Sequence, residues 1–318
     1  MDIPILITAW RRVEKLENLL HAIKENKPKK IYFSCDGPRK NNLNDEKLIK
    51  NVKESFNKLI NWDCEIHKKY NKENLGCRVA MITAINWFFE NESEGIILED
   101  DCIPRKEFFP YCAELLQKYR NNHKVWTISG SNFQRGIKRG DGSYYLSKYF
   151  HCWGWATWRD RWSKIDSFMS TWPKAKETNS IKSIFPDPLE FKYWNKIFDK
   201  FFVRKIPDTW DIEWTYTCFI NQGYTIIPNY NLVKNIGFDQ EATHTKYSIQ
   251  NLPGIDKELI LPINHPNFLI QDVLADRFTF YNFYRMNFKK RIKFILKKAL
   301  YFPKKVLKLI FYFLVNLF

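Results

Sequence analysis

The chain has 318 residues, of which 45% are hydrophobic and 17% are aromatic. This composition excludes a chain that is disordered throughout, and the length exceeds that of a typical domain of roughly 100–200 residues. The formal net charge is +16, but residues 277–318 hold eleven Lys and Arg and no acidic residue. The basic charge therefore belongs largely to the C-terminal segment, and we expect no nucleic-acid partner.

Strands and helices alternate along the first part of the chain. Apolar runs predict strands at residues 3–9, 31–35, 63–67, 95–98 and 125–128. Apolar residues at helical spacing predict helices at residues 13–26, 45–60, 79–89 and 107–119. Because crossover helices join the first four strands, the sequence predicts an α/β fold with a doubly wound, mainly parallel sheet.

The regular alternation ends in an aromatic-rich region at residues 130–173, which includes the run HCWGWATW at 151–158. Such a region can form a second hydrophobic cluster under long loops. It can also form a platform for a sugar or a nucleobase, because aromatic faces pack against apolar ring faces. The two interpretations are compatible.

Three consecutive acids, Glu99, Asp100 and Asp101, follow the apolar strand at residues 95–98. Adjacent carboxylates repel one another unless they are solvated, protonated or shared with a hard cation. The simple alternative is a solvated acidic loop. However, ligands in parallel α/β sheets gather at the carboxyl ends of buried strands. The sequence therefore predicts a Mn²⁺ or Mg²⁺ site here.

Seven cysteines are scattered along the chain without Cys-x-x-Cys spacing. An odd number without metal-ligand spacing is typical of reduced, mostly buried thiols. The apolar run at residues 3–9 is too short for the hydrophobic region of a signal peptide. We therefore expect a cytoplasmic protein.

Several motifs carry a family resemblance, and they occur in a fixed order. They are ILITAWRR at residues 5–12, IYFSCDG at 31–37, NLGCR at 74–78, LEDDCIP at 98–104 and FF at 108–109. Over about residues 3–245 the chain resembles the nucleotide-sugar glycosyltransferases of the GT-A fold, and is similar to the inverting N-acetylglucosaminyltransferase I type. The resemblance implies a nucleotide-sugar donor, with UDP as its nucleotide, and a glycan or lipid-linked glycan acceptor.

The resemblance also implies roles for particular residues. Asp101 would be the direct metal ligand, and His244 a phosphate or metal contact, although a lone His in a loop is more often neither. Nucleotide and donor-sugar contacts would come from Ala9, Arg11, Arg12, Asp36, Arg78, Glu99 and Asp100. Independently of the resemblance, Ser129 and Gly130 follow the strand predicted at 125–128, and we expect them to contact the acceptor or the donor sugar. Of the two neighbouring arginines we prefer Arg12 as the phosphate ligand; a solvated charge before a helix is the alternative for either.

An inverting transfer needs a base that takes the proton of the acceptor hydroxyl. The segment DTWDIEW at residues 208–214 is similar to the Trp-acid-acid-Trp element that carries the base in the family, but Ile212 separates the two acids here. On a helix Asp211 and Glu213 point about 200° apart, so only one of them should face the site. We favour Asp211, for which a helix-capping acid is the alternative.

The C-terminal segment predicts membrane association. From residue 288 apolar residues alternate with lysines at helical spacing, and residues 306–318 are strongly apolar after Pro303. Thirteen residues are too few to span a bilayer, which needs roughly 20. We therefore expect a tail at 276–318 that attaches peripherally to an anionic inner membrane surface, although it could instead pack on its own domain or a partner. It follows a domain at 1–275, with a nucleotide-binding half at 1–128 and an acceptor-side half at 129–275.

Two other functions compete with a metal-dependent glycosyltransferase. A membrane-docked polyanion-binding module would place basic and aromatic residues along one groove, whereas here the basic residues collect in the tail. A sugar nucleotidyltransferase normally has a Gly-rich phosphate loop after its first strand. Residues 9–12 contain no Gly, which counts against that reading.

Overall fold

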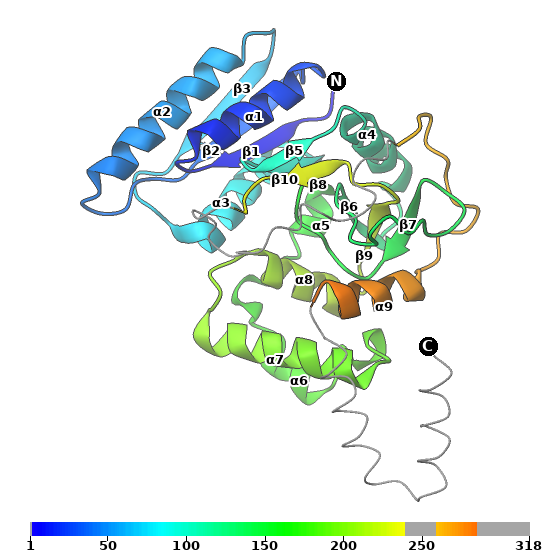
Figure 1. The fold of residues 1–318 in the computed structure, drawn as a ribbon. Helices are drawn as coiled ribbons and strands as arrows, with labels where there is room; N and C mark the ends of the chain where they lie inside the picture. Colours follow the sequence, from blue (N-terminus) through cyan, green and yellow to red (C-terminus); the bar gives the residue numbers. More distant parts are fainter. Residues whose placement is uncertain (1, 239–258, 285–318) are drawn as a thin grey trace, which may run out of the picture.

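The computed structural model describes residues 2–238 and 259–284 (Figure 1). Its centre is an eight-stranded mixed sheet in the order β3-β2-β1-β4-β8-β6-β9-β7. The strands are β1 (Ile5–Ala9), β2 (Lys30–Cys35), β3 (Glu65–Tyr70), β4 (Glu94–Glu99), β6 (Val125–Ser129), β7 (Tyr144–Ser147), β8 (Trp155–Trp158) and β9 (Tyr224–Pro228). A small second sheet pairs β5 (Cys102–Pro104) with β10 (Val233–Asn235).

Helices surround the main sheet. They are α1 (Val13–Lys24), α2 (Leu43–Leu59), α3 (Gly76–Asn91), α4 (Phe108–Tyr119), α5 (Arg159–Trp162), α6 (Trp172–Glu177), α7 (Pro188–Arg204), α8 (Asp211–Ile220) and α9 (Val273–Asn282). Short 3-10 turns occur at Ser167–Met169 and Lys182–Ile184.

The predicted fold class is confirmed, because β3, β2, β1 and β4 form a parallel set joined by α1, α2 and α3. Alternate strand residues bury on opposite faces. Ile5 and Ile7 pack into the hydrophobic cluster with α1 and α2, whereas Leu6 packs into the cluster with α3. The crossover helices α1 and α2 therefore lie on one face of the sheet, and α3 lies on the other. The switch occurs at β1, where the carboxyl ends of β1 and β4 are expected to open a ligand crevice.

The second half of the sheet is irregular because β8 inserts antiparallel between β4 and β6. The tryptophans of the aromatic-rich region occupy two kinds of position, the hydrophobic core and the wall of a cavity. Trp155, Trp158 and Trp162 are buried in the hydrophobic core. Trp153 is only half-buried and belongs to the wall of a cavity. The region therefore contains the second hydrophobic cluster that the sequence allows.

The domain boundary expected at residue 275 falls inside α9. Ser147 donates a hydrogen bond to Asp276 (2.5 Å), and Gln134 donates one to Thr279 (2.8 Å), so α9 packs against the rest of the domain. Phe280 is buried with residues of α7 and α8. The tail beyond residue 284, with the membrane attachment predicted for it, lies outside the described residues. Within the described ranges, no helix is both long and apolar enough to cross a membrane.

All seven cysteines are free thiols, as the sequence predicts. Four of them are buried and three are half-buried. Two of the half-buried thiols, Cys77 and Cys152, line a cavity at the carboxyl ends of β1 and β4.

Candidate functional site

A cavity of about 700 Å³ opens at the carboxyl ends of β1 and β4. Its size falls within the range of roughly 300–1,000 Å³ that is usual for small-molecule sites. One wall is polar and comes from the ends of β1, β2 and β4 and the start of α3. The opposite wall is mostly aromatic and comes from the second half of the chain. The structure therefore has a cavity at the place where the strand order predicts a ligand crevice.

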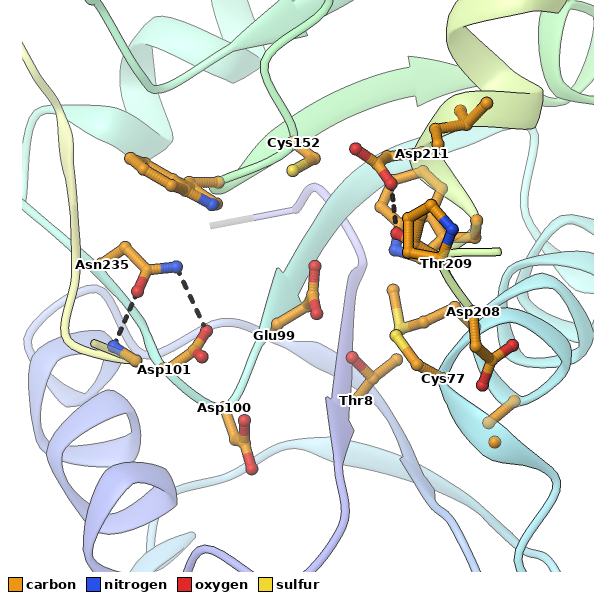
Figure 2. Close-up of a pocket in the computed structure, with 18 of the residues that line it drawn as sticks. Thr8, Cys77, Glu99, Asp100, Asp101, Cys152, Asp208, Thr209, Asp211 and Asn235 are labelled. Atoms are coloured by element: carbon orange, nitrogen blue, oxygen red, sulfur yellow. Dashed lines mark hydrogen bonds between the residues drawn. The ribbon is translucent and has the colours of Figure 1, made fainter. Parts of the chain in front are cut away.

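The three acids at the end of β4 differ in their surroundings. Arg12 binds both oxygens of Asp100, one at 3.3 Å from its Nε, and also donates from Nη1 to Asp101 at 2.7 Å. Asp100 is buried under this guanidinium, whereas Asp101 is partly exposed. Figure 2 shows the Glu99 carboxylate directed into the cavity. It forms no hydrogen bond with any other described residue.

The clustering of these acids changes their protonation. Burial and the charge of Asp101 raise the pKa of Glu99 to about 8, with further contributions from Asp100 and Asp211, although Arg12 opposes them. Burial also raises the pKa of Asp100 to about 6, against the lowering effect of Arg12. Because one arginine does not compensate three neighbouring carboxylates, these two acids retain their protons to a higher pH than isolated carboxyl groups do.

A divalent metal fits this strand end only if its other ligands come from a bound molecule. No group of three or more His, Cys, Asp or Glu side chains among residues 2–238 and 259–284 forms a complete metal site. However, Mg²⁺ in nucleotide sites is typically held by one or two carboxylates, with phosphate oxygens supplying further ligands. Glu99 and Asp101 offer hard oxygen ligands of this kind at the cavity wall.

The strand β10 brings a second segment against Asp101. The backbone N–H of Ile236 donates to the Asp101 carbonyl oxygen at 2.9 Å, and Asn235 Oδ1 accepts from the Gly237 N–H at 2.7 Å. A Cβ atom at Gly237 would lie 2.1 Å from Asp101 Oδ2, so any larger residue at this position would require the Asp101 side chain to shift. The beginning of the polar loop that contains His244 therefore lies at the acids, while His244 itself is outside the described residues.

The polar wall at β1 and β2 is held by ion pairs and hydrogen bonds. Trp10 has Arg11 and Arg39 over its ring, at 4.7 and 5.2 Å from the ring centre. Both arginines bind Asp45, Arg11 at 3.2 Å and Arg39 at 2.6 Å. Arg11 therefore lines the cavity but is engaged by protein groups.

Asp36, which the resemblance implies to be a nucleotide contact, lines the cavity. Its carboxylate accepts hydrogen bonds from Asn71 (2.9 Å), Asn74 (2.8 Å) and the backbone N–H of Gly37 (2.9 Å) and Leu75 (3.2 Å). Asp36 therefore fixes the loop before α3 at the edge of the cavity. Ala9, also predicted as a nucleotide contact, lies in the same wall.

Asp211 and Glu213 point in different directions from the first turn of α8. Asp211 lines the cavity and accepts a hydrogen bond from Thr209 Oγ1 (Figure 2). Asp211 is the first residue of α8, after the N-cap residue Trp210, so it does not occupy the N-cap position but is an acid of the first turn. Glu213 is fully buried away from the cavity, where it accepts from Arg78 Nη1 at 3.2 Å and from the Phe168 backbone N–H.

Three further predicted contacts also lie outside the cavity wall. Arg78 is engaged with Glu213 and lies over the Phe168 ring at 4.2 Å. The Ser129 hydroxyl donates to the His151 carbonyl oxygen at 2.8 Å, and Gly130 N–H donates to the Gly154 carbonyl oxygen at 2.7 Å. Ser129 and Gly130 therefore hold the segment at residues 151–154, of which residues 151–153 line the cavity.

The aromatic wall contains residues that sequence reasoning did not identify. It is assembled from the β6–β7 and β7–β8 connections, α7, the start of α8 and the end of α9, and its members are Phe133, Phe150, Trp153, Tyr193, Trp194, Trp210, Phe283 and Tyr284. Only the aromatic density near residue 153 could have indicated this wall. The contributions from α7 and α9 depend on how distant segments pack.

No family model matches the chain, and no curated protein matches it. Several solved structures show low similarity. 4-Diphosphocytidyl-2C-methyl-D-erythritol synthase from Anaerococcus prevotii DSM 20548 has 11% identity and a TM-score of 0.34, covering 76% of this chain and 95% of that chain.

UDP-glucose pyrophosphorylase complexed with UDP-glucose has 10% identity and a TM-score of 0.31, covering 52% of this chain and 80% of that chain. The glycosyltransferase GlyE of Streptococcus pneumoniae TIGR4 has 10% identity and a TM-score of 0.31, covering 78% and 57%. Similarity of this size does not decide between the activities of these proteins. The functional argument therefore depends on the cavity.

Proposed function

We propose that this chain is a metal-dependent glycosyltransferase that moves a sugar from a nucleoside diphosphate sugar to a hydroxyl group, with inversion. One observation carries the proposal. A single cavity joins the acidic end of β4, with Arg12 beside it, to the separate carboxylate of Asp211. This arrangement supplies one region for a diphosphate and another for an acceptor base.

The leaving group determines what the polar wall must do. When the bond between the anomeric carbon and the phosphate oxygen breaks, negative charge develops on the departing nucleoside diphosphate. A divalent ion bound at Asp101 would neutralise this charge without proton transfer. Arg12 lies against Asp101 and can bind a phosphate oxygen from the same place. Glu99 is directed into the cavity and can accept hydrogen bonds from donor-sugar hydroxyls.

The acceptor side requires a base. Asp211 takes the proton of the acceptor hydroxyl while that oxygen attacks the anomeric carbon, and the nucleoside diphosphate leaves on the opposite side. The hydrogen bond from Thr209 orients the Asp211 carboxylate. Glu213 does not enter this scheme, because its carboxylate is buried against Arg78.

The decisive experiment incubates the full chain with a panel of nucleotide sugars and candidate acceptors, with and without Mn²⁺. The proposal expects metal-dependent release of a nucleoside diphosphate. A parallel reaction with sugar 1-phosphates and nucleoside triphosphates tests for pyrophosphate, the product of a nucleotidyltransferase. Pyrophosphate release without nucleoside diphosphate release would overturn the proposal.

A further inference from the structure

One face of α7 carries a line of exposed basic side chains. They are spaced four residues apart and form what we call the basic stripe: Lys192, Lys196, Lys200 and Arg204. Residues at this spacing share one side of a helix, and twelve residues extend about 18 Å along its axis. Within residues 2–238 and 259–284 no acidic side chain pairs with the stripe, and Asp199 of α7 binds Lys176 of α6 instead, at 2.7 Å.

The other sides of α7 are occupied by the protein itself. Trp194, Phe198 and Phe201 are buried in the hydrophobic cluster that α7 shares with α6 and α8. Tyr193 and Ile197 line the cavity. A helix with its side chains is roughly 10–12 Å across. A surface that binds the basic stripe is therefore held within about one helix diameter of the cavity.

Exposed apolar side chains lie at the C-terminal end of the basic stripe. Val203 is 76% exposed, and Ile206, just after the helix, is 52% exposed. Phe168 is also exposed, and Lys205 Nζ lies 5.4 Å from the centre of its ring. Lysines beside exposed apolar groups are typical of a surface that enters the headgroup region of a membrane, because the charges attract anionic lipids and the apolar groups insert. A soluble polyanion gains nothing from the apolar groups.

The C-terminal segment of the sequence continues from the same helix. Tyr284, the last described residue, packs against Trp194 and Tyr193 of α7 with ring centres 5.1 and 5.9 Å apart. Residues 285–318 carry ten Lys and Arg and no acidic residue. The chain therefore leaves the described domain beside α7, so this segment and the basic stripe can reach the same anionic surface.

We propose that the basic stripe, together with Val203, Ile206 and Phe168, is a docking face by which the folded domain binds membranes that contain anionic lipids. This docking face is separate from the attachment expected of the C-terminal segment, because it belongs to α7 and the loops beside it. It brings the cavity close to the bilayer surface. The inference does not depend on the activity proposed for the cavity.

Co-sedimentation of the full chain with lipid vesicles tests the charged part of the docking face. The vesicles are phosphatidylcholine with or without phosphatidylglycerol. The triple variant Lys192→Gln/Lys196→Gln/Lys200→Gln should weaken partition onto the anionic vesicles at least tenfold, because each lysine near an anionic surface adds to the attraction. The matched control removes the same charge from α1 and α2, which are distant from α7 (Figure 1), and should partition like the wild type: Lys24→Gln/Lys47→Gln/Lys58→Gln.

A second variant tests the apolar part of the docking face. Val203→Ser with Ile206→Ser should weaken partition about fivefold, and the loss should persist at high salt, because apolar insertion is not screened. Leu43→Ser on α2 is the control, because Leu43 is 79% exposed and closely matches Val203. The thermal unfolding midpoint should be unchanged in every variant, which separates lost partition from lost folding.

Three results would overturn the docking face. The first is equal partition of the α7 lysine variant and its control on α1 and α2. The second is the absence of wild-type partition onto anionic vesicles. The third is binding of dextran sulfate through the three α7 lysines while the serine variant partitions like the wild type, which would assign the stripe to a soluble polyanion. Metal-dependent release of a nucleoside diphosphate tests the proposed activity separately from all three.

Discussion

The two walls of the cavity use different physical means to position their groups. In the polar wall, charged side chains are held by specific partners, as Arg12 is by Asp100 and Asp101. In the aromatic wall, ring stacking and burial hold the side chains, as in the Phe133–Phe283 pair. The polar wall is arranged around charge, which suits a diphosphate and a cation. The aromatic wall includes Trp210, the neighbour of Asp211, and offers apolar ring faces to a bound molecule.

The largest expected effect concerns Asp211, the proposed base. Asp211→Asn should lower kcat by about 1,000-fold or more, because the amide cannot take the acceptor proton. Donor binding should persist. The measurement is initial-rate transfer with the nucleotide sugar that the wild type uses. Asp199→Asn, at a partly exposed acid outside the cavity, serves as the control. Near-normal turnover by Asp211→Asn would eliminate its role as the base.

The second prediction separates Glu213 from Asp211. Removing one partner of a buried ion pair leaves the other charge uncompensated, so Arg78→Ala should lower the free energy of unfolding by about 3 kcal/mol. Urea denaturation followed by fluorescence measures this change. Replacing both residues, as Arg78→Met with Glu213→Leu, should recover much of the loss.

A double variant that folds and still transfers sugar would show that Glu213 supports the site structurally. Complete loss of transfer in a stably folded double variant, with donor binding intact, would instead assign Glu213 a role in the reaction.

The smallest of the three effects tests the charge network of the polar wall. Hydrogen bonds from Arg39, together with its charge and a bond from Arg11, lower the pKa of Asp45. Because the folded-state pKa is depressed, the stabilisation is present above the unfolded value near pH 4 and is lost as the pH falls through the folded value. Asp45→Asn should therefore cost about 2 kcal/mol at pH 7 and progressively less below pH 4.

Thermal unfolding between pH 2 and pH 7 measures this difference, with exposed Asp63→Asn as the control. An equal loss of stability at pH 7 and pH 2 would contradict a charge-based role for Asp45.

The sequence allowed the polar wall to be predicted more fully than the aromatic wall. Each parallel strand and crossover helix has its own apolar periodicity, so the sequence places the three acids at the carboxyl end of the fourth parallel strand. The pairing of this strand with β1 comes from the structure. The spacing of Asp211 and Glu213 also indicated that only one would face the site.

The aromatic wall depends on contacts between distant segments. Phe283 meets Phe133 only because α9 returns across β7, and no local pattern near either residue indicates this. Similarly, Arg78 was predicted as a ligand contact because it ends the NLGCR motif at residues 74–78, one of the motifs that carry the family resemblance. On the helix its side chain turns away to Glu213.

The central claim is that the end of β4 binds a cation together with a diphosphate. Isothermal titration of the full chain with UDP, alongside GDP, CDP and dTDP, in the presence of Mn²⁺ or EDTA, tests it most directly. The account predicts that one nucleotide binds at a single site, that EDTA weakens this binding at least tenfold, and that Asp101→Asn abolishes the difference between Mn²⁺ and EDTA. Equal affinity with and without Mn²⁺, or no binding of any nucleotide by the wild-type chain, would contradict it.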